Sequence, residues 1–224
     1  MRILAISDIH GCLHTFKAIL QQINYTKADQ LFLIGDFIDR GPDSKGVIDH
    51  IWDLQAQGFS ITCIKGNHEQ MLLNGLNDWS KAKMWLFHGG SQTLDSFKAA
   101  DMSDVPKKYI EWMNNLPHYV EFQKYIFVHA GLNFDVPNPF EAEHSMLWIR
   151  DWYPNVNFSW LGNRIIVHGH TPFKKDSIEE MFTKMDYLQV LDIDAGCCFE
   201  YEGLGHLCCV DLSNRKLYFR KRVL

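Results

Sequence analysis

Hydrophobic positions in the first third of the chain follow two alternating periods. Short continuous apolar runs predict buried strands at residues 2–7, 31–34 and 59–64. Between and after them, apolar residues recur at the spacing of an amphipathic helix, at residues 13–23, 44–57 and 68–76. Alternation of short apolar strands with helices indicates βαβ units and a largely parallel sheet.

The rest of the chain has a different pattern. Residues 79–115 predict several short helices, and residues 135–160 predict no single element. A loop of that length inside a compact domain is more often functional than idle. Further strands are predicted at residues 119–122, 125–129, 164–168, 189–193, 207–211 and 216–221. With no internal repeat and no linker, the pattern favours one α/β domain over residues 1–224, with two packed sheets.

Composition narrows the class of protein. Hydrophobic residues make up 46% and charged residues 22% of the 224 residues, which is typical of a globular protein and excludes a disordered chain. The net charge of −5 argues against a nucleic-acid-coating protein. No apolar run approaches the roughly 18 residues of a membrane span, and the N-terminal run is too short for a signal peptide. We therefore expect a cytoplasmic protein with reduced cysteines, no nucleic-acid partner and no membrane partner.

Histidines and carboxylates gather where predicted strands end. Five strand ends carry such a polar cluster, and ligands of α/β sheets bind beyond the carboxyl ends of strands. Asp8 and His10 are two residues apart, so in extended chain they project to the same face. The five clusters are Ser7-Asp8-Ile9-His10-Gly11, the segment 35–43, Lys65-Gly66-Asn67-His68-Glu69, the segment 127–131 and the segment 167–172.

These clusters supply a defined type of metal ligand. Asp, His and Asn side chains without Cys suit Mn²⁺, Fe²⁺ or Zn²⁺. One cluster alone is weak evidence for a metal site, but five clusters at five strand ends are hard to explain as ordinary solvated side chains. Six ligands that share one bridging carboxylate would bind two metal ions, about 3.5–4 Å apart in sites of this kind.

The same motifs resemble those of the calcineurin-like metallophosphoesterases. The match is closest to the phosphoprotein phosphatase branch and its compact bacterial and phage members, such as the phosphatase of phage lambda. The motifs follow the family's order from residue 8 to about residue 172. They are Asp8-x-His10, Gly35-Asp36-x-x-Asp39-Arg40-Gly41, Gly66-Asn67-His68-Glu69, His129, Leu147-Trp148-x-Arg150 and Gly169-His170-Thr171. The resemblance implies an α/β fold, a two-sheet β-sandwich of mixed strands flanked by helices.

The resemblance also implies which residues bind the metals. It places Asp8, His10 and Asp36 on one ion. It places Asp36, Asn67, His129 and His170 on the other, with Asp36 bridging. Two divalent ions are implied, with Mn²⁺ favoured and Fe or Zn possible.

The resemblance implies catalytic roles for four further residues. Two cations lower the pKa of a shared water, so that a bridging hydroxide can attack phosphorus directly. Arg40 and Arg150 would hold the phosphate oxygens, because guanidinium groups bind phosphate bidentately. His68 would protonate the leaving alkoxide as general acid, with Asp39 holding its ring in the required tautomer.

Simpler interpretations of some of these residues stay open from the sequence. Asp39 could be a helix N-cap, and Arg150 could be a surface cation beside Asp151. His168 and His170 alternate along an extended strand, so only one of them should be a ligand. The motif alignment selects His170. His88 stands where related sequences tend to have Asn, and no role is assigned to it.

Three functions are compatible with these motifs. The leading hypothesis is a metal-dependent phosphomonoesterase, a serine/threonine or dual-specificity protein phosphatase acting on a phosphorylated protein or a small phosphoester. The alternative is a symmetrical dinucleoside-tetraphosphate hydrolase or another nucleotide phosphoesterase, because that group shares the signatures. A non-catalytic binding module would usually have lost ligands, and none is missing here.

Overall fold

The computed structural model describes residues 1–223 and confirms the predicted strands to within one residue at each end. The helices predicted over residues 13–23, 44–57 and 68–76 are also present. The strands are β1 Ile3–Ile6, β2 Gln30–Leu33, β3 Ser60–Cys63, β4 Tyr119–Phe122, β5 Tyr125–Val128, β6 Ile165–His168, β7 Val190–Asp192, β8 His206–Asp211 and β9 Lys216–Lys221.

Helical elements fill the connections between these strands. Residues 135–160, which predicted no single element, form short helices and turns. Two helices between β6 and β7 were not predicted from the sequence. The α-helices are α1 Leu13–Gln22, α2 Ser44–Ala56, α3 Asn67–Gly75, α4 Trp79–Trp85, α5 Ser91–Phe97, α6 Lys107–Asn114, α7 Glu143–Trp148, α8 Phe158–Leu161, α9 Lys175–Thr183 and α10 Met185–Leu188. Shorter turns are the π-turn η1 Leu86–Gly90 and the 3₁₀ turns η2 Met102–Asp104, η3 Pro139–Glu141 and η4 Tyr153–Asn155.

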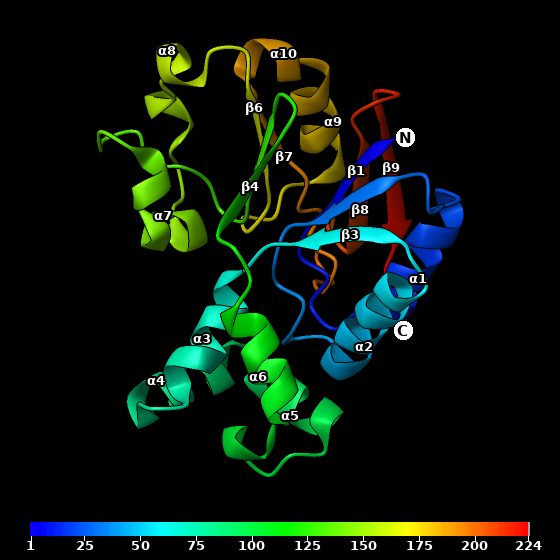
Figure 1. Cartoon of the computed structure of the whole chain (residues 1–224), viewed down its shortest axis with the longest axis vertical. Helices are drawn as coiled ribbons and strands as arrows, with labels where there is room; N and C mark the ends of the chain where they lie inside the picture. The colour runs from blue at the N-terminus through cyan, green and yellow to red at the C-terminus, as the bar shows by residue number, and fades with distance from the viewer. Residues whose placement is uncertain (224) are drawn as a thin grey trace.

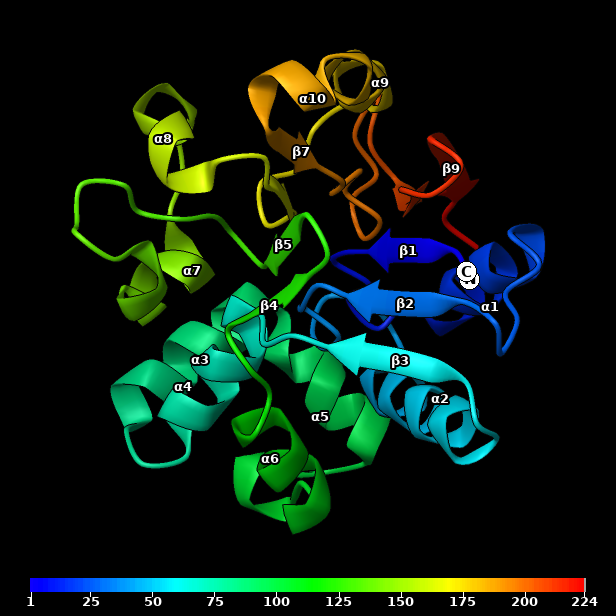
Figure 2. The same ribbon diagram turned by 45° about the horizontal axis from the view of Figure 1, so that its top comes forward.

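Two mixed sheets form the centre of the molecule. One has the order β3-β2-β1-β8-β9 and the other the order β4-β5-β6-β7. The strands β1, β2 and β3 are parallel and lie side by side (Figure 2), whereas β8 pairs antiparallel with β1 and with β9. The expected largely parallel sheet is therefore only part of the fold, because β8 and β9 form a hairpin on its edge. Within residues 1–223, no helix has the length and apolar character needed to cross a membrane.

Alternating side chains of the strands build separate apolar layers. Ile3 and Ala5 of β1 face the second sheet and pack with Phe127 and Val167 between the two sheets. Leu4 and Ile6 face the opposite way, toward the helices α1 and α2. A third cluster covers the outer face of the second sheet with residues of α7, α8 and the loop between them. The sandwich thus has an inner core and helical cover on both outer sides.

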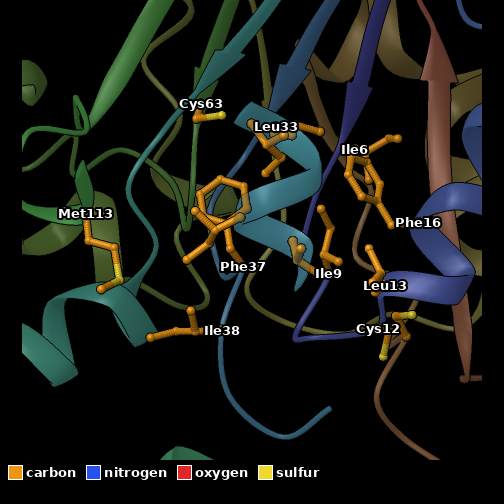
Figure 3. Packing of buried hydrophobic residues seen from close by; sticks show 14 of the residues in the cluster. Ile6, Ile9, Cys12, Leu13, Phe16, Leu33, Phe37, Ile38, Cys63 and Met113 are labelled. Atoms are coloured by element: carbon orange, nitrogen blue, oxygen red, sulfur yellow. The ribbon is translucent and has the colours of Figure 1, made fainter. Parts of the chain in front are cut away.

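The apolar layer continues beneath the loops that follow β1 and β2. Figure 3 shows Ile9, Phe37 and Ile38 pointing into the same cluster as Ile6 and Leu33. All of these side chains are almost completely buried. Apolar residues stand between polar ones in these loops. The apolar side chains pack into the core and fix the loops, and the polar side chains do not take part in this packing.

Candidate metal centre

The loops that follow five strands bring the predicted polar residues together. Loops after β1, β2 and β3 come from the first sheet, and those after β5 and β6 from the second. Backbone hydrogen bonds join the loops directly, from His10 N to Asp36 O at 2.8 Å and from Gly169 N to His129 O at 2.8 Å. The six residues that the resemblance assigns to metal binding are all buried: Asp8, His10, Asp36, Asn67, His129 and His170.

Left-handed backbone is concentrated in these loops. Asp8, His10, Asp36 and His170 have φ values of 34°, 45°, 51° and 75°. Residues other than glycine adopt this region rarely and at a cost of order 1–3 kcal/mol each. The surrounding hydrogen bonds and packing therefore hold the chain in conformations that direct these side chains to one point, which is typical of functional sites.

His10, Asp36 and His68 form the first group of candidate ligands, with one nitrogen or oxygen of each within 4.8 Å of the others. His10 Nε2 lies 3.5 Å and His68 Nε2 lies 3.9 Å from Asp36 Oδ2. The His10 Nδ1 hydrogen is donated to Ile38 O at 2.8 Å, which leaves a lone pair on Nε2. Arg40 Nη1 donates to that lone pair at 2.7 Å.

Asp36, His129 and His170 form the second group. His129 Nδ1 donates to Ile34 O at 2.9 Å, so a neutral His129 presents a lone pair at Nε2. That lone pair faces two other acceptor atoms, Asn67 Oδ1 at 2.8 Å and Asp36 Oδ1 at 3.5 Å. Burial lowers the pKa of His129 to about 3, so the ring is neutral. His170 Nε2 is buried without a hydrogen-bond partner.

This arrangement fits a pair of cations. The two groups share the Asp36 carboxylate, with Oδ2 facing the first and Oδ1 facing the second. Burial, followed by the Asp8 carboxylate, raises the pKa of Asp36 well above its usual range, which shows how unfavourable its charge is without a cation. A cation between His129 Nε2 and Asn67 Oδ1, which lie 2.8 Å apart, would stabilise the lone pairs that these two atoms present to one another.

Asp8 is not a member of either group, but its carboxylate lies close enough to Asp36 to raise the pKa of that residue. Asp8 Oδ2 accepts the backbone N–H of His170 at 3.1 Å, so it connects the loops after β1 and β6. A Cβ on Gly169 would lie 2.2 Å from that same oxygen, so only glycine allows this close approach.

His68 and Asp39 form a buried pair beside the first group. His68 Nδ1 lies 2.6 Å from Asp39 Oδ2, and both side chains are almost completely buried. Burial raises the pKa of Asp39, while the hydrogen bonds from Thr93 and Trp85 lower it. Asp39 also has φ of 71° and lies before the start of α2, where Asp43 is the N-cap. The N-cap interpretation of Asp39 is therefore wrong.

Arg40 and Arg150 both line a small cavity, together with His68 and His170. The cavity has a volume of about 100 Å³ and is lined by Asp36, Arg40, Asn67, His68, Met71, His88, Trp148, Arg150 and His170. Arg150 is exposed, and its Nη1 donates to Thr171 Oγ1 at 2.8 Å. The two guanidinium groups give this cavity the positive charge and the hydrogen-bond donors that a phosphate group requires.

Glu69 organises the loop that carries Asp36. Its buried carboxylate accepts four backbone N–H groups, from Asp36 at 3.0 Å, Phe37 at 2.8 Å, Ile38 at 3.3 Å and Gly66 at 2.9 Å. These bonds connect the loop after β2 with the start of α3. The carboxylate therefore fixes the position of the bridging Asp36 without itself facing the cavity.

We expect Glu69→Gln to lower the free energy of unfolding by about 2–4 kcal/mol, because the new amide leaves buried N–H donors unpaired at about 1–3 kcal/mol each. Chemical denaturation measures this loss. The matched control is the exposed Glu179→Gln, which should change stability by less than about 0.5 kcal/mol. Equal stability of the two variants would contradict the role given to Glu69.

Some residues of the site were not singled out from the sequence. Trp85 and Thr93 donate to Asp39 from the segment after α3, and nothing in their local pattern marks them as polar partners of a buried carboxylate. His168, one of the two alternating histidines, points away from the cavity and bonds the Tyr153 hydroxyl at 3.0 Å. The selection of His170 over His168 for the cavity agrees with this geometry.

Comparisons with known proteins are consistent with this geometry. The family model described as "Calcineurin-like phosphoesterase" matches residues 1–198. Serine/threonine-protein phosphatase 1 of Salmonella typhimurium is 28% identical over 201 residues, which cover 87% of this chain and 86% of that protein. The symmetrical bis(5'-nucleosyl)-tetraphosphatase of Pseudomonas fluorescens is 32% identical over 136 residues.

The extent of these matches differs. The match to the tetraphosphatase covers 59% of this chain and 42% of that protein, so the chain spans less than half the length of this relative. A solved protein serine/threonine phosphatase of Saccharomyces cerevisiae superposes with a TM-score of 0.70, covering 100% of this chain and 81% of the yeast chain. At 14% identity this likeness shows the fold alone.

Proposed function

Because the chain belongs to the calcineurin-like phosphoesterase family, we propose that it is a metal-dependent phosphatase that removes phosphate from serine and threonine residues of proteins. Membership of the family makes the chain a phosphoester hydrolase with a dinuclear metal centre. The observation that carries the proposal is the pair of ligand groups sharing Asp36, beside the His68–Asp39 pair and two arginines. We take residues 1–224 as one catalytic domain.

The residues proposed to hold the two ions are those around Asp36, together with Asp8 and Asn67, which the family resemblance adds. We assign Asp8, His10 and Asp36 to the first ion, and Asp36, Asn67, His129 and His170 to the second. His68 is left out because its Nδ1 is bound to Asp39 and its Nε2 faces the cavity. We propose Mn²⁺ as the metal on the family resemblance, since His, Asp and Asn ligands without Cys suit Mn²⁺, Fe²⁺ and Zn²⁺ alike. Divalent ions at such a site supply a nucleophile by lowering the pKa of water and neutralise phosphate charge.

The chain's own side chains then complete the reaction. Arg40 and Arg150 bind the phosphate oxygens in the cavity and orient phosphorus for in-line displacement. His68 Nε2 donates a proton to the leaving oxygen, and Asp39 keeps the opposite ring nitrogen protonated. Proton donation matters most for a poor leaving group such as a serine alkoxide, so this pair suits a phosphomonoester of an alcohol.

The longer sequence match favours a protein phosphatase over a nucleotide hydrolase. The Salmonella phosphatase aligns with this chain over 201 residues, whereas the Pseudomonas tetraphosphatase aligns over 136 residues. The second candidate is a symmetrical dinucleoside-tetraphosphate hydrolase. It is favoured by the identity of 32% over the matched 136 residues, which is slightly higher than for the phosphatase.

A parallel assay separates the two candidates. Metal-stripped protein reconstituted with Mn²⁺ is given a phosphoserine peptide and, separately, diadenosine tetraphosphate. The proposal predicts phosphate from the peptide, at least about tenfold faster in kcat/KM than any release of ADP from the dinucleotide. If ADP forms and the peptide is not hydrolysed, the second candidate function is supported and the proposed metal centre is unaffected.

A further inference from the structure

The Asp39 carboxylate is enclosed by hydrogen-bond donors that the proposed mechanism does not use. Trp85 Nε1 donates to Oδ2 at 2.8 Å, and Thr93 Oγ1 donates to Oδ1 at 2.6 Å. His68 Nδ1 shares Oδ2 at 2.6 Å. The four side chains are at most 1% exposed, so each polar group must find its partner within the protein.

The direction of each hydrogen bond follows from the chemistry of the donors. An indole N–H can only donate, so Oδ2 of Asp39 is an acceptor toward Trp85. Thr93 has one hydroxyl hydrogen, and the Asp39 Oδ1 bond uses it. Its oxygen lies 3.0 Å from Ser44 Oγ and accepts the Ser44 hydrogen there. Both oxygens of Asp39 therefore accept hydrogen bonds, which stabilises the ionised carboxylate, and with Asp39 ionised the hydrogen of the His68–Asp39 bond lies on His68 Nδ1.

Backbone contacts from the same segment fix where Asp39 stands. Trp85 is the last residue of α4 and Thr93 belongs to α5, with the π-turn η1 between them. The Asp39 N–H is bound by Thr93 Oγ1 at 2.9 Å, and the next residue, Arg40, donates its N–H to Gly89 O at 3.1 Å. Asp39 and Arg40 both have left-handed backbone, with φ of 71° and 67°. The segment thus holds two consecutive residues in a costly conformation.

We propose that Trp85 and Thr93 are positioning residues for the general acid, which fix the Asp39 carboxylate so that His68 keeps its hydrogen on Nδ1 and presents Nε2 to the leaving oxygen. This inference rests on the proposed function, in which His68 donates that proton. As the phosphorus–oxygen bond breaks, its electron pair stays with the leaving oxygen, which takes the proton from Nε2. Water supplies the hydroxyl to phosphorus, and its other proton returns to His68 at the end of the cycle.

Thr93 offers the cleaner test of the two. Trp85 is tightly seated, since a Cβ on Gly90 would lie 2.4 Å from its ring, so its replacement leaves a cavity. Thr93→Val removes only the hydroxyl and nearly keeps the volume, while Thr93→Ser keeps the hydroxyl. The readout is the ratio of kcat on a phosphoserine peptide to kcat on p-nitrophenyl phosphate, whose leaving group needs no proton.

We expect Thr93→Val to lower this ratio by about tenfold or more, within the 10²–10⁴-fold range that general acids contribute, and Thr93→Ser to restore it. Trp85→Phe, which also lacks the donor, should lower the same ratio and serves as the second variant if Thr93→Val does not fold. An equal loss on both substrates in the folded variants, or no loss on either, would overturn the proposal.

A double variant separates this inference from the proposed function. In a His68→Asn background, Thr93→Val should cause no further fall in the ratio, because it acts through His68. A further fall of similar size would overturn the positioning role. If His68→Asn alone leaves the ratio unchanged, then His68 is not the general acid. That result would refute the proposed function, and with it the positioning role of Trp85 and Thr93.

Discussion

Replacing Asp36 with Asn lowers phosphatase activity by about 10³-fold or more. Asp36 is the residue that both ligand groups share, so the variant loses charge at both candidate metal positions. Metal ions contribute several kcal/mol of charge stabilisation, and each 1.36 kcal/mol is about tenfold in rate. The amide still accepts the His68 backbone N–H through its oxygen, a bond of 3.0 Å in the wild type, so the loop keeps its shape. The measurement is kcat/KM on the phosphoserine peptide in excess Mn²⁺.

Stability distinguishes loss of metal from loss of fold in this variant. Asp36 is buried and its pKa is raised, so its charge destabilises the metal-free protein, and Asp36→Asn should not lower the melting temperature without Mn²⁺. Mn²⁺ should raise the melting temperature of the wild type and leave the variant unchanged. Asp43→Asn, in the same loop, is the matched control because Asn caps α2 equally well. Full activity of Asp36→Asn would refute the shared-ligand role.

The second large loss of activity is expected when His68 is replaced. We expect His68→Asn to lower kcat on a phosphoserine peptide by about 10²–10⁴-fold, the usual contribution of a general acid. Asn keeps a donor close to the position of Nδ1 and so preserves the contact with Asp39, but it has no group at the position of Nε2. On p-nitrophenyl phosphate, whose leaving group needs no proton, the loss should be at least tenfold smaller, about the margin expected of an acid catalyst.

His14→Asn is the matched control for this variant. His14 is exposed on α1, and its substitution should change neither substrate's rate. Metal content, measured on the same samples, should be equal in His68→Asn and the wild type. A variant that lost its metal, or that lost equal activity on both substrates, would show that His68 binds a metal ion, as its place in the first ligand group also allows.

The sequence could predict those residues of the site that lie at the ends of strands. Each of Asp36, Asn67 and His129 follows a short apolar strand, and parallel strands bring their carboxyl ends to one edge. The same reasoning predicted the strands within one residue, because buried strands are apolar runs bounded by polar loops. Local patterns sufficed here because each ligand lies within a few residues of the strand that positions it.

These local patterns could not predict contacts between segments that are distant in the sequence. Thr93 meets Asp39 across 54 residues of sequence and Trp85 meets it across 46. Periodicity assigns both of them to short helices and says nothing of which buried oxygen they reach. The contact of the Asp8 carboxylate with the His170 backbone N–H, 162 residues away, could not be predicted for the same reason.

Local pattern alone does not predict the antiparallel edge of the first sheet, although the mixed strands that the family resemblance implies are confirmed. The βαβ units at the N-terminus are parallel, but β8 and β9 add an antiparallel hairpin to the same sheet. Strand direction on joining a sheet is decided by the connection and by which edge is free, and neither is visible in an apolar run. The helices α9 and α10 between β6 and β7 were missed because they are short and flanked by lysines rather than by clear caps.

Metal stoichiometry tests the central claim most directly. The chain is stripped of metal, titrated with Mn²⁺, and its bound ions and phosphatase activity on the phosphoserine peptide are measured on the same samples. The account predicts two ions per chain in the wild type, activity that rises with occupancy and is abolished by a chelator, and neither ions nor activity in Asp36→Asn. Full hydrolysis by the metal-free chain, or two ions retained by Asp36→Asn, would contradict it.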